Sequence, residues 1–370
     1  MTLPAAGDLA SRIAALPAGQ PLVRALTDLE GVHVVGGAVR DLLLGGSPTD
    51  LDLVVEGEIG PVTERLGGTV RGHDRFGTAT VVLDGFSYDI ARARRERYPH
   101  PGALPEVEPA ALAEDLLRRD FTVNAMAIVV GGGERGELHS VPGAGDDLDA
   151  RRLRVLHEAS FTDDPTRLIR LVRYRARLGF EIETETRSLA QDAVAGGAIE
   201  TVSGPRIGAE LRLLAREPDP VAALASLGEL GLDRAIHPEF GLREPGLARR
   251  AIELLPPSGR ADLLVLAATA RGVPADELQP LLDRLAFEAG ERTAIVSAAA
   301  GADRLADELA SARNASGIAG AVGARGPETV ALAGALGPAD AAREWLERLS
   351  AVRLEIDGSD LIAAGIAEGP

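Results

Sequence analysis

The residue pattern changes near Asp146, and this change constrains the fold more than any other feature of the sequence. Before it, short apolar runs such as Val32–Val35 alternate with polar turns, and Asp84-Gly85 is a strong hairpin signal between two such runs. After it, Leu, Ala and Arg recur at helical spacing to the end of the chain. The sequence therefore predicts an α+β head followed by an all-helical remainder.

The length and residue usage narrow the class of protein. A chain of 370 residues exceeds one ordinary core, so we expect several packed units. The chain has no cysteine, which excludes disulfides and thiolate metal sites, and its six histidines show no zinc-binding spacing. No apolar run reaches the roughly 18 residues of a membrane helix, and the N-terminus lacks the pattern of a signal peptide. We expect a cytoplasmic protein without a membrane partner.

Charge is distributed unevenly along the chain. The net charge is −17, which argues against a nucleic-acid partner. Between Tyr88 and Phe180, however, 15 arginines balance 15 acidic residues, so the whole excess of negative charge lies elsewhere. All basic residues are arginine, a side chain suited to bidentate contacts with phosphate and base edges. The central part of the chain is thus the better candidate for phosphate contacts.

A glycine pair follows the first predicted strand. Gly36 and Gly37 come directly after Val32–Val35 and precede Arg40. Paired glycines let the backbone approach a phosphate closely, and the N–H groups at the start of the next helix point toward an anion. The spacing differs from that of the dinucleotide-binding pattern. The pair is compatible with a phosphate-binding turn, to which Arg40 would add positive charge, and with a plain turn.

Two carboxylates lie at the start of a second predicted strand, at 51–55. Asp50 and Asp52 are two residues apart, so on an extended chain both side chains point to one face. They repel one another unless a cation lies between them, and Mg²⁺ prefers such oxygen ligands. Asp89, on the second strand of the hairpin, could complete a site for two metal ions about 4 Å apart. The alternative is a capped strand start with solvated acids.

A third motif, at 118–127, places charged groups in an apolar stretch. Two arginines, a carboxylate and an amide occur within it, as Arg118, Arg119, Asp120 and Asn124. Buried charge is costly without a partner. A triphosphate and the hydroxyls of a ribose are candidate partners, and an internal Arg–Asp ion pair is the alternative.

A fourth motif, Asp163-Asp164-Pro165-Thr166-Arg167, predicts the start of a helix. Pro165 fits the first turn, and an acid before it fits the N-cap. Asp164 and Arg167 are three residues apart and hence neighbours on one face, where they could read the edge of a base. The arginines of this helix share a stripe: Arg167, Arg170, Arg173 and Arg177. Such a stripe is usually a solvated face, but its position beside Asp164 and Arg167 favours RNA binding.

In this order the four motifs resemble the class II tRNA nucleotidyltransferase and bacterial poly(A) polymerase family, which includes the CCA-adding enzymes. The motifs are Gly-Gly-x-x-Arg-Asp at 36–41, Asp-x-Asp at 50–52, Arg-Arg-Asp-Phe-Thr-x-Asn-Ala at 118–125 and Asp-Pro-x-Arg at 164–167. Each motif is weak alone, whereas the ordered set is specific. The resemblance covers about 31–235, including Pro205-Arg206-Ile207, which resembles part of the family's neck.

The resemblance implies an activity and an architecture. The activity is template-independent addition of CMP and AMP, from CTP and ATP, to the 3′ end of tRNA, by two-metal phosphoryl transfer that releases pyrophosphate. The implied architecture is a polymerase-β-like catalytic head at 1–140, a helical neck with the base-recognition motif at 141–215, a helical body at 216–300 and a helical tail at 301–370. No obligatory protein partner is evident.

The resemblance also implies roles for individual residues. Asp50, Asp52 and Asp89 would carry out catalysis, and Asp50 and Asp52 would bind Mg²⁺. Contacts with the triphosphate and ribose fall to Gly36, Gly37, Arg40, Arg119, Asp120 and Asn124. Base selection falls to Asp164 and Arg167, and RNA binding falls to Arg170 and Arg173.

Several activities within the family stay open. CC-only relatives lack part of a flexible loop that corresponds to 92–108 here, which disfavours CC-only addition. Poly(A) synthesis requires a broad basic surface, and the acidic body disfavours it. A catalytically weak RNA-binding relative is disfavoured because all the acids are present. The sequence does not separate complete CCA addition from A-only addition.

The chain departs from the family pattern at three places. Asp163 stands where the family usually has Glu, which leaves its role open. Residues 261–269 lack the His-Asp pair of relatives that carry a phosphohydrolase segment, so we expect no such activity. Relatives tend to continue beyond the segment at 357–365, so we expect that the tail could be truncated.

Overall fold

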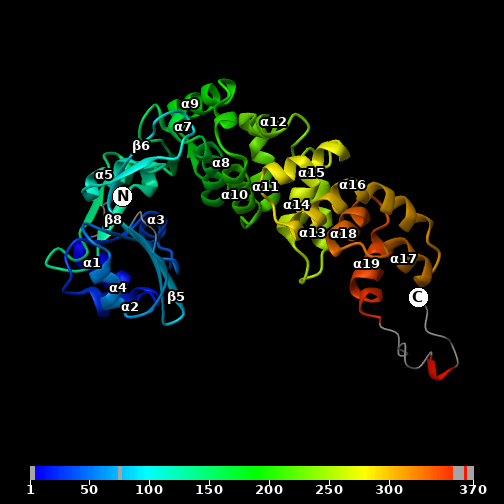
Figure 1. Ribbon diagram of the computed structural model, residues 1–370, viewed down its shortest axis with the longest axis horizontal. Helices are drawn as coiled ribbons and strands as arrows, with labels where there is room; N and C mark the ends of the chain where they lie inside the picture. The colour runs from blue at the N-terminus through cyan, green and yellow to red at the C-terminus, as the bar shows by residue number, and fades with distance from the viewer. Residues whose placement is uncertain (1–4, 74–76, 353–361, 365–370) are drawn as a thin grey trace. The chain divides into compact units, whose positions relative to one another are not determined.

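The structure, a computed structural model, describes residues 5–73, 77–352 and 362–364 (Figure 1). It divides into two compact units. Unit 1 consists of Met1–Ser203 and Leu230–Ala235, and unit 2 consists of Gly204–Glu229 and Ile236–Pro370. Unit 1 contains the predicted head and most of the predicted neck, and the borders predicted at 140, 215 and 300 stay a proposal.

Unit 1 is built on a seven-stranded sheet with the order β3-β4-β5-β2-β1-β8-β9. β2 and β5 are parallel, and the other neighbours are antiparallel. The strands are β1 (Val32–Val35), β2 (Leu53–Val55), β3 (Thr69–His73), β4 (Thr78–Leu83), β5 (Phe86–Arg92), β8 (Met126–Val129) and β9 (Leu138–Ser140).

The predicted hairpin at Asp84-Gly85 is confirmed. These two residues connect Leu83 to Phe86, which are paired across β4 and β5. Both have positive φ, 52° at Asp84 and 84° at Gly85. A two-residue turn with positive φ at both positions matches the twist of the flanking strands, which is why Asp-Gly is favoured there.

Helices and short strands complete unit 1. Two small sheets pair β6 (Arg94–Arg97) with β7 (Glu106–Pro109), and β10 (Arg152–Leu153) with β11 (Glu181–Ile182). The helices are α1 (Ala6–Ala15), α2 (Gly19–Leu26), α3 (Gly37–Leu43), α4 (Gly60–Leu66), α5 (Leu112–Leu117), α6 (Ala144–Asp149), α7 (Ser160–Asp163), α8 (Thr166–Leu178) and α9 (Thr184–Ala195). The segment 121–130, which is apolar in sequence, forms a 3₁₀ turn at Thr122–Asn124 and then β8.

The described part of unit 2 is helical, as predicted. Its centre is α14, in which every residue from Leu263 to Ala270 is buried. The helices of unit 2 are α10 (Gly204–Ala215), α11 (Pro220–Ala225), α13 (Pro245–Leu254), α14 (Ala261–Ala270), α15 (Ala275–Arg284), α16 (Ala289–Ser311), α17 (Ala315–Val322), α18 (Pro327–Ala335) and α19 (Ala339–Glu347), and α12 (Leu232–Ile236) crosses the border between the units.

Segments that contain Pro and Gly separate several of these helices. Residues 217–220, 256–259 and 323–327 lie at the junctions of α10 with α11, α13 with α14, and α17 with α18. The segment at 357–365, on which the expected truncation depends, lies largely outside the described residues.

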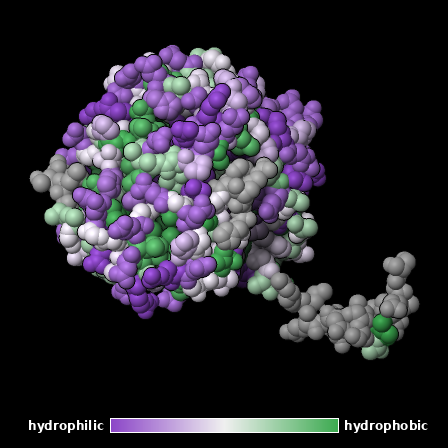
Figure 2. Space-filling view, turned by 60° about the vertical axis from the view of Figure 1, so that its left-hand side comes forward, coloured by the Kyte–Doolittle hydropathy of each residue, from purple (hydrophilic) through white to green (hydrophobic). Residues whose placement is uncertain are grey.

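None of the described helices is both long and apolar enough to span a bilayer. On the face in Figure 2, hydrophilic side chains surround scattered hydrophobic patches.

Candidate active site

The glycine turn joins β1 to α3 and requires glycine at its first position. Gly36 has φ 72° and ψ −133°, a conformation that side chains with a Cβ rarely adopt. Its N–H donates to the carbonyl of Met126 at 3.0 Å. A Cβ at Gly36 would lie 3.0 Å from Nη1 of Arg119, so the turn also leaves room for that guanidinium.

Arg40 lies inside unit 1 and connects several elements. Its side chain is buried, donates from Nε to Asp41 at 2.8 Å and from Nη1 to Asn124 Oδ1 at 2.5 Å, and has its Cζ 5.4 Å from the centre of the Tyr174 ring. A buried guanidinium with these partners orients Asn124 and Tyr174. Its predicted contact with a triphosphate stays a prediction.

The structure brings two of the predicted carboxylates together. β2 begins at Leu53, so Asp50 and Asp52 precede the regular strand, although the carbonyl of Asp52 still accepts from Val35 N–H at 3.0 Å. Leu53 pairs with Ile90 across the parallel ladder, which places Asp52 beside Asp89. Both acids line a cleft of about 640 Å³ together with Arg71, Arg118 and Arg119.

Electrostatics in this cleft favour a bound cation. Residue Asp52 as a whole is exposed, yet its carboxyl group loses solvent within the cleft, which raises its pKa. The charges of Asp89 and Asp50 raise the pKa further, and Arg119 opposes them. The Thr80 hydroxyl donates to Asp89 at 2.6 Å and fixes that side chain. Adjacent carboxylates of this kind are a suitable donor set for hard divalent cations.

Asp115 holds the two arginines of the third motif. It lies on α5 and is fully buried. It accepts from Arg118 Nε and from Arg119 Nη2, each at 2.9 Å, and from the backbone N–H of Arg94 at 3.3 Å. Sequence reasoning missed this residue. An acid three and four positions before two arginines in a helix was the available signal.

Asp120 forms an ion pair, but with a residue of a distant helix. It accepts from Phe121 N–H at 2.8 Å, from Asn124 Nδ2 at 2.9 Å and from Arg170 Nε at 3.0 Å. Burial by itself would raise the pKa of Asp120, but the charge of Arg170 and these hydrogen bonds lower it overall. The internal Arg–Asp ion pair considered from the sequence is therefore present, and Arg170 supplies its positive charge.

The predicted base-reading pair lies at the start of α8. Asp164 Oδ1 accepts from the Thr166 hydroxyl at 2.6 Å and from its N–H at 3.1 Å, as a helix-capping acid does. Arg167 is buried and donates to Ser160 Oγ at 2.8 Å and to the carbonyl of Arg118 at 2.6 Å. Both residues line a smaller cavity of about 340 Å³.

The arginine stripe of α8 is not a uniformly solvated face. Arg173 is only 6% exposed and lies with its Cζ 4.9 Å from the centre of the Tyr174 ring. Arg170 is half-buried against Asp120, whereas Arg177 is exposed. The contacts of Arg170 and Arg173 with RNA stay a prediction, and their burial shows that they also stabilise unit 1.

The two cavities adjoin one another and form one site, because Asp52, Arg118 and Arg119 line both. Most predicted site residues line it: Gly36, Gly37, Asp52, Asp89, Arg119, Asp120, Asn124, Asp164, Arg167 and Arg170. Asp50, Arg40 and Arg173 are not among the lining residues.

Glu96 and Tyr98 line the smaller cavity and were missed, since nothing in a single sequence marks them. Glu96 accepts from Arg118 at 2.9 Å and from the Tyr98 hydroxyl at 3.0 Å.

Comparison with known proteins finds tRNA nucleotidyltransferases that are similar to this chain. The family model described as the poly(A) polymerase head domain matches residues 32–154. An A-adding tRNA nucleotidyltransferase of Geobacter sulfurreducens is 44% identical over 216 residues, which are 57% of this chain and 24% of the relative. A CC-adding tRNA nucleotidyltransferase of Deinococcus radiodurans is 44% identical over 213 residues, 56% of each protein. The chain spans about a quarter to a half of the length of the first three curated relatives.

Solved structures are similar over most of the chain. The apo form II of a CCA-adding enzyme has a TM-score of 0.79 and 31% identity, over 91% of this chain and 84% of that one. The CCA-adding enzyme of Thermotoga maritima, solved in complex with tRNA, has a TM-score of 0.79 and 28% identity, over 100% and 92% of the two chains. This likeness confirms the predicted fold class. The chain belongs to the tRNA nucleotidyltransferase and poly(A) polymerase family, the family of the CCA-adding enzymes.

Proposed function

We propose that this chain adds CMP and AMP, from CTP and ATP, to the 3′ end of tRNA, either as complete CCA addition or as addition of the terminal A. One observation carries the proposal. Acids suited to a metal ion, arginines suited to a triphosphate, and the Asp164–Arg167 pair all line one site made of two adjoining cavities. Relatives named as A-adding and CC-adding enzymes support tRNA as the acceptor.

Enzymes of this family use divalent metal ions, and we propose Mg²⁺ for this chain. Asp52 and Asp89 would hold it, with Asp50 close enough to raise the pKa of Asp52. When bound, Mg²⁺ stabilises the charge of the triphosphate and acidifies the attacking 3′-hydroxyl, with pyrophosphate as the leaving group. Arg119 lies beside the Gly36 turn, where it can bind phosphate oxygens.

The Asp164–Arg167 pair offers a physical basis for base selection. Cytosine and adenine both present an amine donor beside a ring-nitrogen acceptor, whereas guanine and uracil present a carbonyl beside an N–H. A carboxylate accepts from the amine, and a guanidinium donates to the ring nitrogen. Arg167 has five N–H donors, and two of its nitrogens are used by Ser160 and Arg118, so donors remain for a base.

The segment 92–108 bears on which nucleotides are added. It forms the β6–β7 hairpin, and its residues Glu96, Tyr98 and Pro105 line the smaller cavity. CC-only relatives lack part of the corresponding loop. A hairpin that contributes lining residues to the site therefore supports addition that includes the terminal A.

A direct assay tests the proposal. The protein is incubated with Mg²⁺, labelled CTP or ATP, and tRNA that lacks either its last three nucleotides or only its terminal A. We expect CTP incorporation on the shorter tRNA only for complete CCA addition, and ATP incorporation on the longer tRNA for both activities. The absence of incorporation on both tRNAs, or equal ATP incorporation on unstructured RNA, would contradict the proposal.

A further inference from the structure

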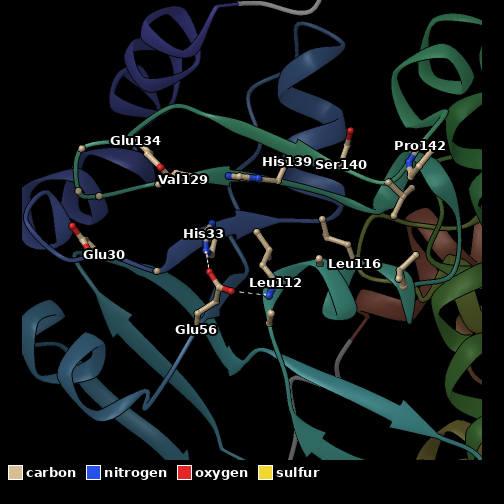
Figure 3. A pocket seen from close by; sticks show the side chains of 18 residues that line it. Glu30, His33, Glu56, Leu112, Leu116, Val129, Glu134, His139, Ser140 and Pro142 are labelled. Atoms are coloured by element: carbon tan, nitrogen blue, oxygen red, sulfur yellow. Dashed lines mark hydrogen bonds and ion pairs between the residues drawn. The ribbon is translucent and has the colours of Figure 1, made fainter.

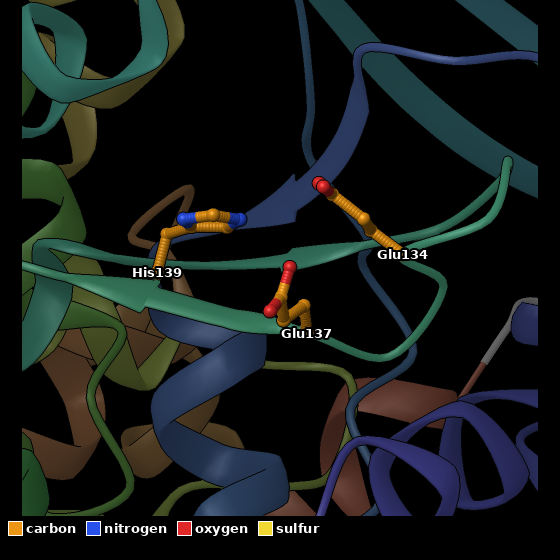
Figure 4. Close-up of side chains that lie close together, drawn as sticks. All are labelled: Glu134, Glu137 and His139. Atoms are coloured by element: carbon orange, nitrogen blue, oxygen red, sulfur yellow. The ribbon is translucent and has the colours of Figure 1, made fainter.

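A group of metal-ligand side chains lies at the β9 edge of the sheet, away from the candidate active site. Glu137 lies directly before β9 and His139 within it, and Glu134 lies in the loop that connects β8 to β9. Figure 4 shows their side chains close together. One ligand atom from each of the three lies within 4.8 Å of the others.

Among the described residues, none of these three side chains forms a hydrogen bond or ion pair. The chain contains 39 arginines, and many of its other acids are paired with one. Two carboxylates this close repel one another unless a cation lies between them. A cation bound between the two glutamates would relieve this repulsion.

A buried histidine provides a second, independent observation. His33 on β1 is 4% exposed, and its Nδ1 is buried without a hydrogen-bond partner. Its Nε2 lies 3.2 Å from Glu56 Oε2. The two nitrogens of an imidazole face nearly opposite directions, so Nδ1 faces away from Glu56. The His33 and His139 ring centres are 6.0 Å apart, and both residues line one cavity of about 760 Å³ (Figure 3).

The Glu56 contact prepares His33 to act as a ligand. A histidine that binds a metal through one nitrogen typically donates its other N–H to a carboxylate, which fixes the tautomer. Glu56 is itself held, because its Oε1 accepts from the N–H of Leu112 at 2.8 Å. With the proton on Nε2, Nδ1 of His33 presents a lone pair on the side away from Glu56.

We propose that Glu134, Glu137, His139 and Nδ1 of His33 bind one divalent transition-metal ion of the Zn²⁺ class. Imidazole nitrogen favours Zn²⁺ over Mg²⁺, which prefers oxygen ligands alone. Bonds of about 2.0–2.1 Å in a tetrahedral site place ligand atoms roughly 3.4 Å apart. The ligand atoms of Glu134, Glu137 and His139, which lie within 4.8 Å of one another, must therefore approach by up to about 1.4 Å. Nδ1 of His33 lies outside that group and must approach as well. The loop at 131–136 contains four glycines and both glutamates are exposed, so this contraction is inexpensive.

The proposed site is separate from the candidate active site within unit 1. Its cavity shares no lining residue with the two cavities around Asp52. Asp52 lies just before β2 and Glu56 just after it, about 13 Å apart along an extended chain. A metal ion here would cross-link β1 to β9, which is a structural role and independent of the proposed nucleotide addition.

Metal retention in the full chain tests the proposal. The protein is stripped with a chelator, equilibrated with ZnSO₄ in a large excess of Mg²⁺, separated from free metal, and analysed for bound zinc. The Asp52→Ala background removes competition from the candidate active site. We expect one bound zinc per chain in this background, and a higher melting temperature with zinc than without.

Three variants and a matched control identify the ligands. His139→Ala and the double variant Glu134→Gln/Glu137→Gln should lose the bound zinc, whereas Glu64→Gln, an exposed acid of α4, should keep it. Glu56→Gln should weaken zinc binding by roughly 10–100-fold, because it disturbs the orientation of His33. Failure of the background protein to retain zinc, or equal retention in His139→Ala and Glu64→Gln, would overturn the proposal. Full affinity in Glu56→Gln would remove His33 from it.

Discussion

At the scale of single residues, Asp52 is the most exacting test of the proposed activity. Its carboxyl group lies beside Asp89 in the larger of the two site cavities, where burial and then the charge of Asp89 raise its pKa. We expect Asp52→Ala to lower nucleotide addition by on the order of 10³-fold, because the metal ion loses a principal ligand while the fold is retained. Turnover is measured at saturating Mg²⁺, with Asp28→Asn, an exposed acid of unit 1, as the control. Near-normal turnover of Asp52→Ala would refute the metal assignment.

Base selection is a second property, which we propose rests on two residues. Asp164 and Arg167 line the smaller cavity, and Arg167 is buried. We expect Asp164→Asn to erode selection against UTP and GTP, because sites built to hydrogen-bond their substrate discriminate by roughly 10⁴-fold. Arg167→Lys keeps the charge and loses the planar arrangement of donors, so selectivity should fall here too.

To test this pair, kcat/KM is measured for each of the four nucleotides. The ratios of these values are then compared between wild type and variants. Arg167→Ala removes hydrogen bonds to Ser160 and Arg118 and therefore also lowers stability, by about 1–3 kcal/mol. Arg167→Lys separates the two effects. Unchanged ratios in Asp164→Asn and Arg167→Lys would leave the pair with a structural role only.

At the scale of elements, α5 connects the chemistry of the site to the sheet. Its buried Asp115 accepts from Arg118 and Arg119, and its first N–H, at Leu112, binds Glu56. We expect Asp115→Asn to raise the KM for the nucleotide more than it lowers kcat, since the arginines lose their orientation. The loss of a buried charge partner should also lower the free energy of unfolding by about 3–5 kcal/mol.

Denaturant unfolding and steady-state kinetics measure these two effects of Asp115→Asn. Glu114→Gln, an exposed change on the same helix, is the matched control. If Asp115→Asn lowered stability while KM stayed at the control value, Asp115 would support the helix without positioning the arginines.

At the scale of the whole molecule, the net charge of −17 has to be reconciled with the RNA substrate that we propose. The balanced segment from Tyr88 to Phe180 contains α8, so we expect tRNA phosphates to bind mainly there. Arg170→Ala/Arg173→Ala should weaken tRNA binding and flatten its salt dependence, because fewer counterions are released. Binding is measured over a range of salt concentrations, with the melting temperature of the variant as a check on folding, since Arg173 is buried. An unchanged salt slope in a folded variant would place the phosphate contacts elsewhere.

Local sequence rules determined much of this protein. The Asp84-Gly85 turn was predictable because only particular residues tolerate positive φ at both turn positions. The helical remainder was predictable from periodicity, and the order of four short motifs identified the family. For the turn and the helices, the determining interactions lie within a few residues or within one element. The proximity of Asp52 and Asp89 depended in addition on the parallel pairing of β2 with β5, which are far apart in the sequence.

Only the tertiary structure decided which side chains are buried and with whom they pair. Asp120 binds Arg170 rather than an adjacent arginine, and Arg173 is buried although its stripe looks solvated in sequence. His33 and His139 show no metal-binding spacing, yet strand order brings their rings within 6.0 Å. Burial and pairing depend on contacts between segments far apart in the chain. A residue's own neighbours in sequence carry no information about those contacts.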